Sequence, residues 1–140
     1  MAAQITSKIV REVMTIDENR TALEAAVLMT EKFIGSVVVT GTAGIRGLFT
    51  ERDLMMRVVG QKRDPADVLL KDVMSKDLVK IAPDDSPAHC LKLMKDARCR
   101  HLLVFNDDKF SGIVSLRDIV AHMIDEKEDL IKQLETYITS

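Results

Sequence analysis

The chain has 140 residues, of which 46% are hydrophobic and 30% charged, as is typical of a folded globular protein of about one domain. Its 20 basic and 22 acidic residues give a net charge of −2, which argues against a general nucleic-acid binder. No apolar run reaches the roughly 18 residues that span a membrane, and residues 1–8 lack the apolar centre of a signal peptide. With two cysteines that form no CxxC motif, we expect a cytoplasmic protein without a membrane partner.

In the first part of the chain, apolar spacing at residues 9–13 predicts a short leading helix, and residues 14–16 predict a strand. Thr21 is the predicted N-cap of an amphipathic helix of about three turns. Two more strands are predicted at residues 37–39 and 45–49, joined by a glycine-rich turn, and a final helix follows them.

The second part of the chain has the same order of elements. Asp64-Pro65 predicts the N-cap and first residue of a leading helix, and residues 78–81 predict a strand. Ser86 is the predicted N-cap of the next amphipathic helix. Strands are predicted at residues 102–105 and 110–114, again followed by a helix. Each part therefore reads β-α-β-β-α.

One seven-residue pattern occurs in both parts. Residues 47–53 and 112–118 run glycine, two apolar residues, a hydroxyl residue, a variable residue, arginine and aspartate, and they begin 65 positions apart. The same offset pairs other apolar positions, among them Ile16 with Ile81. An internal repeat at one fixed offset indicates a structural unit that is used twice.

The tail beyond the second repeat is predicted to form a helix, because Ile131, Leu134 and Ile138 share one helical face. Such a helix would either fold back on its own domain or form a dimer contact, and the sequence leaves both open. The predicted organisation is a first repeat at residues 1–62, a second repeat at residues 63–125 and a C-terminal helix at residues 126–140.

The repeated pattern places a hydroxyl and a carboxylate three residues apart, where a strand ends and a helix begins. Thr50 with Asp53, and Ser115 with Asp118, could each form a capping box, worth about 1 kcal/mol per cap. In that arrangement the hydroxyl accepts the N3 N–H and the acid accepts the N-cap N–H. Taken singly, either pair requires no other explanation.

Both patterns also place an arginine, Arg52 or Arg117, in the first helical turn, and capping does not explain this residue. A cation there opposes the helix dipole by roughly 0.3–1 kcal/mol unless an anion is nearby. Helix N-terminal N–H groups, a hydroxyl and an arginine together suit a phosphate. An aspartate one turn away can accept two hydrogen bonds from a ribose diol, each worth about 1.5–3 kcal/mol. Phosphate and ribose at that separation describe a nucleotide.

Residues 35–39 and 47–53, with residues 100–104 and 112–118, resemble the two halves of a tandem CBS-domain module, or Bateman module. The resemblance covers about residues 9–125. It implies an α/β fold of two CBS-type repeats packed pseudo-symmetrically as one module. It also implies a homodimer and a non-catalytic regulatory role towards an unidentified partner protein. The implied ligand is an adenine nucleotide held in clefts between the repeats: AMP, ADP or ATP, with NAD(H) or S-adenosylmethionine also open.

The resemblance also assigns ligand contacts. The phosphate and ribose contacts would be Thr50, Asp53, Ser115 and Asp118. Helix charge, as described above, adds Arg52 and Arg117 to this set. The residues lining the base would be Met14, Thr15, Ile16, Val79, Lys80 and Ile81. Arg100 and His101 match a basic pair that faces the phosphates, whereas the first repeat has Gly35 and Ser36 there, so the two sites should not be equivalent.

No catalytic signature and no zinc-ligand spacing occurs in the sequence, so we expect neither an enzyme nor a metal site. The pattern Gly41-x-x-Gly44-x-x-Gly47 lacks the GK[ST] ending of a phosphate-binding loop and predicts a hairpin turn instead. The alternative to a nucleotide sensor is a ligand-free protein-interaction or dimerisation module, in which the hydroxyl and acid pairs only cap helices.

Overall fold

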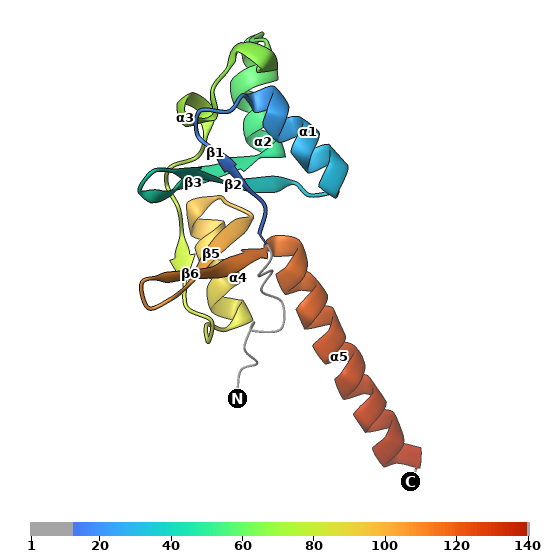
Figure 1. Ribbon diagram of the computed structural model, residues 1–140. Coiled ribbons are helices and arrows are strands. Elements are labelled where there is room, and N and C mark those ends of the chain that lie inside the picture. Colours follow the sequence, from blue (N-terminus) through green and yellow to red (C-terminus); the bar gives the residue numbers. More distant parts are fainter. Residues whose placement is uncertain (1–12, 140) are drawn as a thin grey trace. The chain divides into compact units, whose positions relative to one another are not determined.

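The structure is a computed structural model that describes residues 13–139. These residues form two compact units, Val13–Leu78 and the chain from Val79 onward, each with one three-stranded sheet and its own helices (Figure 1). The α/β class and the C-terminal helix predicted from the sequence are confirmed. Most of the predicted leading helix at residues 9–13 lies outside the described residues.

The first unit has a strand, a helix and a hairpin, followed by a series of short helical turns. Its elements are β1 (Thr15–Asp17), α1 (Ala22–Lys32), β2 (Ser36–Gly41), β3 (Gly44–Thr50), α2 (Glu51–Asp53), a π-helical turn (Leu54–Val58), two 3-10 turns (Val59–Gln61 and Pro65–Asp67) and α3 (Leu70–Val73).

The second unit repeats this order and ends in one long helix. Its elements are β4 (Lys80–Ile81), α4 (Pro87–Ala97), β5 (His101–Asn106), β6 (Lys109–Ser115) and α5 (Leu116–Thr139).

Both sheets have the same topology and register. The short first strand runs parallel to the middle strand, with Ile16 opposite Val39 in one sheet and Ile81 opposite Val104 in the other. The middle and third strands are antiparallel, and the register shifts at the equivalent place in both hairpins, directly after Val39 and Val104. The offset of 65 residues is therefore confirmed as the structural repeat.

One face of each sheet packs against the helices of its own unit. In the first unit the core consists of Ala22, Ala25, Met29, Val37, Val39, Phe49, Val58, Val68, Leu70, Val73 and Met74. In the second unit it consists of Ile81, Cys90, Met94, Leu102, Val104, Val114 and Ile119. Alternate strand residues and one stripe of each helix thus supply each core, as amphipathic elements require.

The segment between the predicted repeats belongs by its contacts to the first unit. Val68, Leu70 and Val73 complete that unit's core. The single leading helix predicted here is wrong: Asp64 caps a short 3-10 turn, and the chain is then extended until α3 begins. An antiparallel bridge between Leu69 and Thr21 breaks the helix at this point. The two compact units are defined by contacts and not by the sequence repeat. They therefore do not test the predicted repeat boundary between residues 62 and 63, which stays a prediction.

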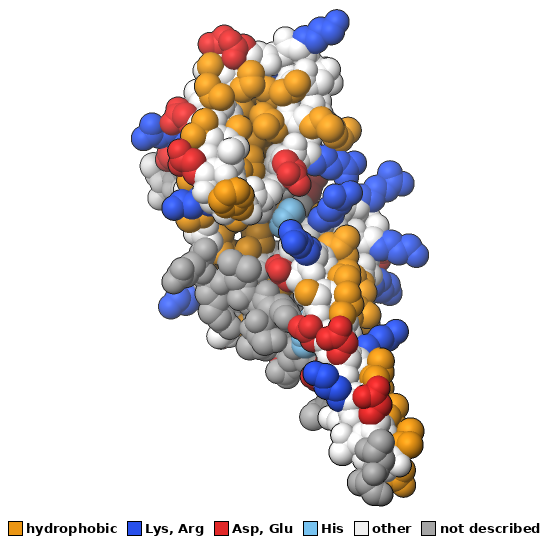
Figure 2. Space-filling view, turned by 90° about the vertical axis from the view of Figure 1, so that its right-hand side faces the viewer, with side chains coloured by type: hydrophobic (Ala, Val, Ile, Leu, Met, Phe, Trp, Pro, Cys, Tyr) orange, Lys and Arg blue, Asp and Glu red, His pale blue; other side chains and the backbone are white. Residues whose placement is uncertain are grey.

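Of the two arrangements that the sequence left open for the tail, the structure does not show the one in which it folds back on its own domain. The tail continues α5 as one 24-residue helix, and every residue from Met123 to Ile138 is exposed. The residues after Gly112 contain neither glycine nor proline, so nothing stops the helix where the repeat ends. Figure 2 shows hydrophobic side chains along one side of this helix. Among the described residues, no helix is long and apolar enough to cross a membrane.

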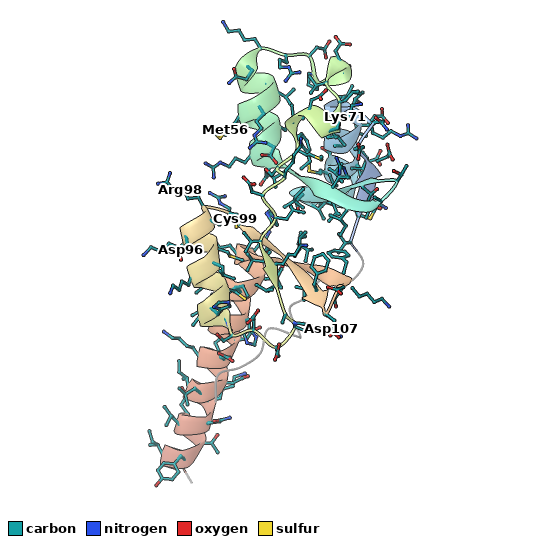
Figure 3. All side chains as sticks on the ribbon, turned by 90° about the vertical axis from the view of Figure 1, so that its left-hand side faces the viewer. Met56, Lys71, Asp96, Arg98, Cys99 and Asp107 are labelled. Atoms are coloured by element: carbon teal, nitrogen blue, oxygen red, sulfur yellow. The ribbon has the colours of Figure 1, made fainter. Side chains whose placement is uncertain are left out.

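Both predicted N-caps are confirmed. Thr21 Oγ1 accepts the N–H of Glu24 at 3.1 Å, and Ser86 Oγ accepts the N–H of His89 at 3.2 Å. The helices that they cap also end alike, each at a residue in the left-handed region. That residue is Phe33 for α1 and Arg98 for α4, whose side chain is labelled at the end of α4 in Figure 3.

Candidate functional site

The two repeated patterns each form a capping box. In the first, the Asp53 N–H donates to Thr50 Oγ1 (3.1 Å) and the Thr50 N–H donates to Asp53 Oδ2 (3.0 Å). In the second, the Asp118 N–H donates to Ser115 Oγ (3.1 Å) and the Ser115 N–H donates to Asp118 Oδ2 (3.0 Å). Capping is therefore confirmed in both repeats, and it occupies one carboxylate oxygen of each aspartate.

The first N–H of each of these helices is also occupied. The Glu51 N–H donates to the carbonyl of Gly35 at 3.0 Å, and the Leu116 N–H donates to the carbonyl of Arg100 at 2.8 Å. Since the third N–H donates to the capping hydroxyl, only the N–H of the arginine between them remains in the first three positions. The helix start thus offers an anion fewer backbone donors than an uncapped helix would.

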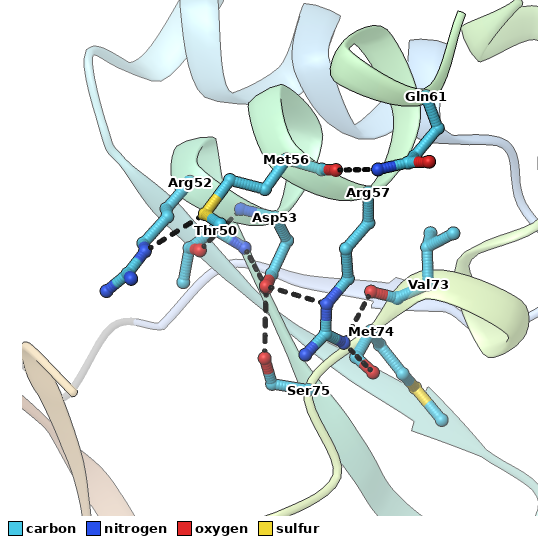
Figure 4. Close-up of polar contacts among 9 residues, drawn as sticks. All are labelled: Thr50, Arg52, Asp53, Met56, Arg57, Gln61, Val73, Met74 and Ser75. Carbon is cyan, nitrogen blue, oxygen red and sulfur yellow. Dashed lines mark hydrogen bonds and ion pairs between the residues drawn. The ribbon is translucent and has the colours of Figure 1, made fainter. Parts of the chain in front are cut away.

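The carboxylate of Asp53 is buried and engaged on both oxygens (Figure 4). It is 7% exposed, and the Ser75 hydroxyl lies 3.1 Å from Oδ1 and 3.2 Å from Oδ2. Arg57 Nε lies 3.7 Å from Oδ1, and its Nη1 donates to the carbonyls of Val73 and Met74 at 3.2 and 3.1 Å. We call Asp53, Arg57 and Ser75 the Asp53 network.

The Asp53 network links the segment after α3 to residues 47–53, the first repeated pattern. Leu48 and Ser75 exchange two backbone hydrogen bonds, of 3.0 and 2.8 Å. Gly47 permits this close approach, because a Cβ there would lie 2.7 Å from the Ser75 carbonyl oxygen and 2.7 Å from Met74 Sδ. The glycine of the pattern is thereby explained in the first repeat by packing rather than by ligand binding.

Sequence reasoning missed both partners of Asp53. Arg57 follows Asp53 by four residues on a helical stretch, a spacing that indicates an ion pair and that could have revealed it. Ser75 is 22 residues away, and no local pattern connects it with the carboxylate.

The carboxylate of Asp118 has a different environment. It is half-buried, and among the described residues its Oδ1 has no hydrogen-bond or ion-pair partner. The residue in the place of Arg57 is His122, whose Nε2 lies 3.2 Å from Glu126 Oε1, outside hydrogen-bond geometry. The second repeat therefore keeps one carboxylate oxygen available to a ligand, and the first repeat does not.

The two arginines of the patterns have exposed side chains on the first helical turn. Arg52 Nε lies 3.4 Å from Met56 Sδ, a weak acceptor. The Arg117 side chain makes no hydrogen bond or ion pair with the residues that the structure describes. Neither guanidinium has a carboxylate partner in this part of the chain, so both remain able to bind an anion.

The first-strand residues divide between core and surface. Four of them pack in the cores of their own units: Met14, Ile16, Val79 and Ile81. Thr15 and Lys80 are exposed, and the Lys80 ammonium lies 4.7 Å from the centre of the Phe105 ring. Of the four core residues only Ile81 is buried, and the other three keep part of their surface exposed.

The residues at the start of the middle strands lie beside the capping hydroxyls. Ser36 is opposite Thr50 in the first sheet, and His101 is opposite Ser115 in the second. Arg100 directly precedes His101 and is exposed. The second unit thus brings Arg100 and His101 next to its pattern, where the first unit has Gly35 and Ser36. Within residues 13–139, no group of three or more metal-ligating side chains could hold a metal ion.

The sequence matches the CBS domain family over residues 3–60 and 70–125. Among curated relatives, it is 38% identical to an uncharacterized protein of Methanopyrus kandleri over 79% of this chain and 57% of that protein. It is 28% identical to the mitochondrial CBS domain-containing protein CBSX3 of Arabidopsis thaliana over 84% of this chain, and spans 60% of that protein. It is 31% identical to the CBS domain-containing protein YhcV of Bacillus subtilis, over 81% of this chain and 80% of that protein.

Solved structures share the fold. A protein with CBS domains from Burkholderia ambifaria, named as a candidate signal-transduction protein, superposes with a TM-score of 0.82 at 30% identity, over 89% of this chain and 95% of that one. A CBS-domain protein of Agrobacterium tumefaciens gives a TM-score of 0.79 at 30% identity, over 86% and 93% of the two chains. Proteins of this family generally have a regulatory, non-catalytic role. The chain belongs to the CBS-domain family and carries two CBS domains in tandem.

Proposed function

We propose that this protein is a regulatory module that binds an adenine nucleotide, or a related adenosyl ligand, chiefly through Ser115, Arg117 and Asp118. The observation that carries the proposal is the available Oδ1 of Asp118 at the start of α5. That oxygen can accept a hydrogen bond from a ribose hydroxyl while Oδ2 keeps the helix cap. Arg117 and the helix N-terminus supply positive charge for a phosphate.

The neighbours of the second pattern support this choice. His101 is opposite Ser115 across the sheet, and Arg100 is exposed beside it, so the Arg100 guanidinium can also donate to phosphate oxygens. In this proposal AMP, ADP, ATP, NAD(H) and S-adenosylmethionine are the ligands to compare. Binding would shift the balance between two conformations and thereby signal to a regulated partner protein. A cleft shared by the repeats and a homodimer stay predictions.

In the first repeat we propose a structural role for the pattern. A ribose diol could reach the carboxylate of Asp53 only by displacing Ser75 and Arg57. Each displaced donor would leave a buried polar group without its partner, which costs about 1–3 kcal/mol. Ligand binding at Thr50 and Asp53 is therefore much weaker than at Ser115 and Asp118.

The direct test is calorimetric titration of the full chain with AMP, ATP, NAD and S-adenosylmethionine. In Asp118→Asn the amide oxygen can still accept the Ser115 N–H, but the amide nitrogen cannot accept a ribose hydroxyl. Losing one charge-assisted hydrogen bond should weaken binding about ten- to hundred-fold. Asp129→Asn, which removes the same charge from the exposed tail, is the matched control and should bind normally.

A second candidate function is a ligand-free protein-interaction module. The two completed capping boxes favour it, because they account for both hydroxyl and acid pairs without any ligand. Thermal unfolding with added nucleotide separates the two functions. A ligand at 100 times its dissociation constant should stabilise the protein by roughly 2.7 kcal/mol. If no nucleotide shifts the transition, the interaction module is correct and the sensor is not.

A further inference from the structure

Three arginines lie close to the start of α5 in the second unit. Arg117 is in the first turn of this helix, and the Leu116 N–H donates to the carbonyl of Arg100 at 2.8 Å. Arg98 precedes Arg100 by two residues and caps the end of α4 (Figure 3). All three residues are exposed. We call Arg98, Arg100 and Arg117 the arginine cluster.

The backbone lets the arginine cluster act on one ligand. Two residues of extended chain span at most about 7 Å, and an arginine side chain has a similar length. The hydrogen bond between Leu116 and Arg100 therefore keeps all three guanidiniums within reach of a phosphate chain that begins at the start of α5.

No acid neutralises the arginine cluster within residues 13–139. The acids nearest to it in the chain, Asp96 and Asp118, form no ion pair with any of the three arginines. The negative end of the α4 dipole favours a cation at Arg98, but it does not neutralise the other two guanidiniums. Like charges held near one another repel, so a ligand with several negative charges would remove this repulsion.

The positive charge is specific to the second repeat. Phe33 stands in the place of Arg98, and the two have nearly the same left-handed backbone, with φ of 54° and 53°. The fold therefore does not require an arginine at this position. Gly35 stands in the place of Arg100. The repeat that keeps an oxygen of Asp118 available is thus also the repeat with the concentrated positive charge.

We propose that the arginine cluster makes the second repeat select a di- or triphosphate of adenosine over AMP. This inference rests on the proposed function and adds the class of ligand to it. The phosphate next to the ribose meets the helix start and Arg117, and the phosphates beyond it meet Arg98 and Arg100. Guanidinium groups suit this role because they bind phosphate oxygens in pairs. S-adenosylmethionine has a positive sulfonium and no phosphate, so it should bind most weakly.

The first test is calorimetric titration of the full chain with AMP, ADP and ATP, without added Mg²⁺, so that each nucleotide keeps its full charge. ATP should bind at least about ten-fold more tightly than AMP, the effect of one further charge-assisted hydrogen bond. Equal affinities, or tighter binding of AMP, would overturn this inference and leave the proposed function standing. Absence of binding by all three nucleotides would overturn both.

Substitution of the arginines tests which residues make the selection. Arg98→Gln and Arg100→Gln should each lower the ratio of ATP affinity to AMP affinity, because AMP does not extend to them. Lys132→Gln removes the same charge about 24 Å further along α5, well beyond the Debye length of about 8 Å, and should keep the wild-type ratio. Equal losses for AMP and ATP in both arginine variants would overturn the selection, because a loss of folding or of the first phosphate contact affects both nucleotides.

The salt dependence of binding gives an independent reading. Raising the salt concentration should weaken ATP binding more than AMP binding, because the exposed guanidiniums are screened. The difference between the two nucleotides should shrink in Arg100→Gln. An ATP affinity that depends on salt no more than the AMP affinity does would mean that the arginine cluster does not bind the additional phosphates.

Discussion

Asp53 and Asp118 occupy the same position of the repeat, yet they differ in what their carboxylates contact. The first is buried and bound by Arg57 and Ser75, whereas the second keeps Oδ1 available. The difference arises from residues outside the pattern: histidine replaces arginine one turn later in the second repeat, and Ser75 comes from the segment that follows α3. Equivalent aspartates can therefore be engaged by their own chain in one repeat and keep an oxygen available to a ligand in the other.

This difference predicts unequal effects on stability. Asp53→Asn removes the charge that Arg57 and Ser75 bind and should lower the free energy of unfolding by about 1–3 kcal/mol. Asp118→Asn should change it by less, since Asp118 is half-buried and its cap survives in the amide. Urea unfolding of both variants and the wild type measures the difference. Equal losses in the two variants would mean that the Asp53 network contributes nothing to folding.

Cys90 predicts a dependence of stability on alkaline pH. Burial, with a smaller effect of the Asp85 carboxylate, raises the pKa of the Cys90 thiol from 9.0 to about 11. The unfolded thiol ionises first, so this contribution to stability is complete below pH 9 and is lost as the pH rises to about 11. Cys90→Ala fits, since Ala25 holds the equivalent place.

Urea unfolding at pH 8 and pH 10.5 should show a smaller pH-dependent loss for Cys90→Ala than for the wild type. Burial also raises the pKa of Cys99, so part of the slope should persist in this variant. An unchanged slope would mean that Cys90 ionises normally in the folded protein.

At the scale of the elements, the segment from Val68 to Ser75 packs against the first repeat and pairs with its third strand. Gly47→Ala would set a Cβ 2.7 Å from the Ser75 carbonyl oxygen. The resulting strain should destabilise the protein by about 1–3 kcal/mol. Gly35→Ala is the matched control, because the nearest atom there is the flexible end of Glu51 at 3.2 Å. Thermal unfolding compares the two variants, and a larger loss in Gly35→Ala would contradict this explanation of Gly47.

Several elements were predictable because their signals are local. Each N-cap, Thr21 and Ser86, marks the start of its own helix, and the apolar run Val37–Val39 marks its own strand. The helical break near Leu69 was not predictable, because it depends on pairing with Thr21, far away in the sequence. The course of α5 was missed for another reason: apolar spacing identifies a helix but does not show where the next helix begins when no glycine or proline intervenes.

For the whole molecule, the unequal motifs predict a stoichiometry. Because Asp53 is already bound by its own chain, nucleotide binding should saturate near one ligand per chain rather than two. Calorimetry at protein concentrations well above the dissociation constant measures this ratio directly. Two sites of equal affinity per chain would refute the assigned difference between the repeats, although the nucleotide-binding proposal itself would stand.

The amino-acid sequence by itself determined that one unit is used twice, the order of its strands and helices, the offset of 65 positions and the family. The repeat and its elements follow from periodicity, caps and motif spacing, which act over a few residues, and the family follows from the similarity of the motif residues to those of known proteins. Only the tertiary structure decided that Ser75 binds the carboxylate of Asp53 and that the hydrophobic residues of α5 from Met123 to Ile138 remain exposed. Both depend on contacts, or on their absence, between residues far apart in the chain, which the local preferences of the backbone and side chains do not encode.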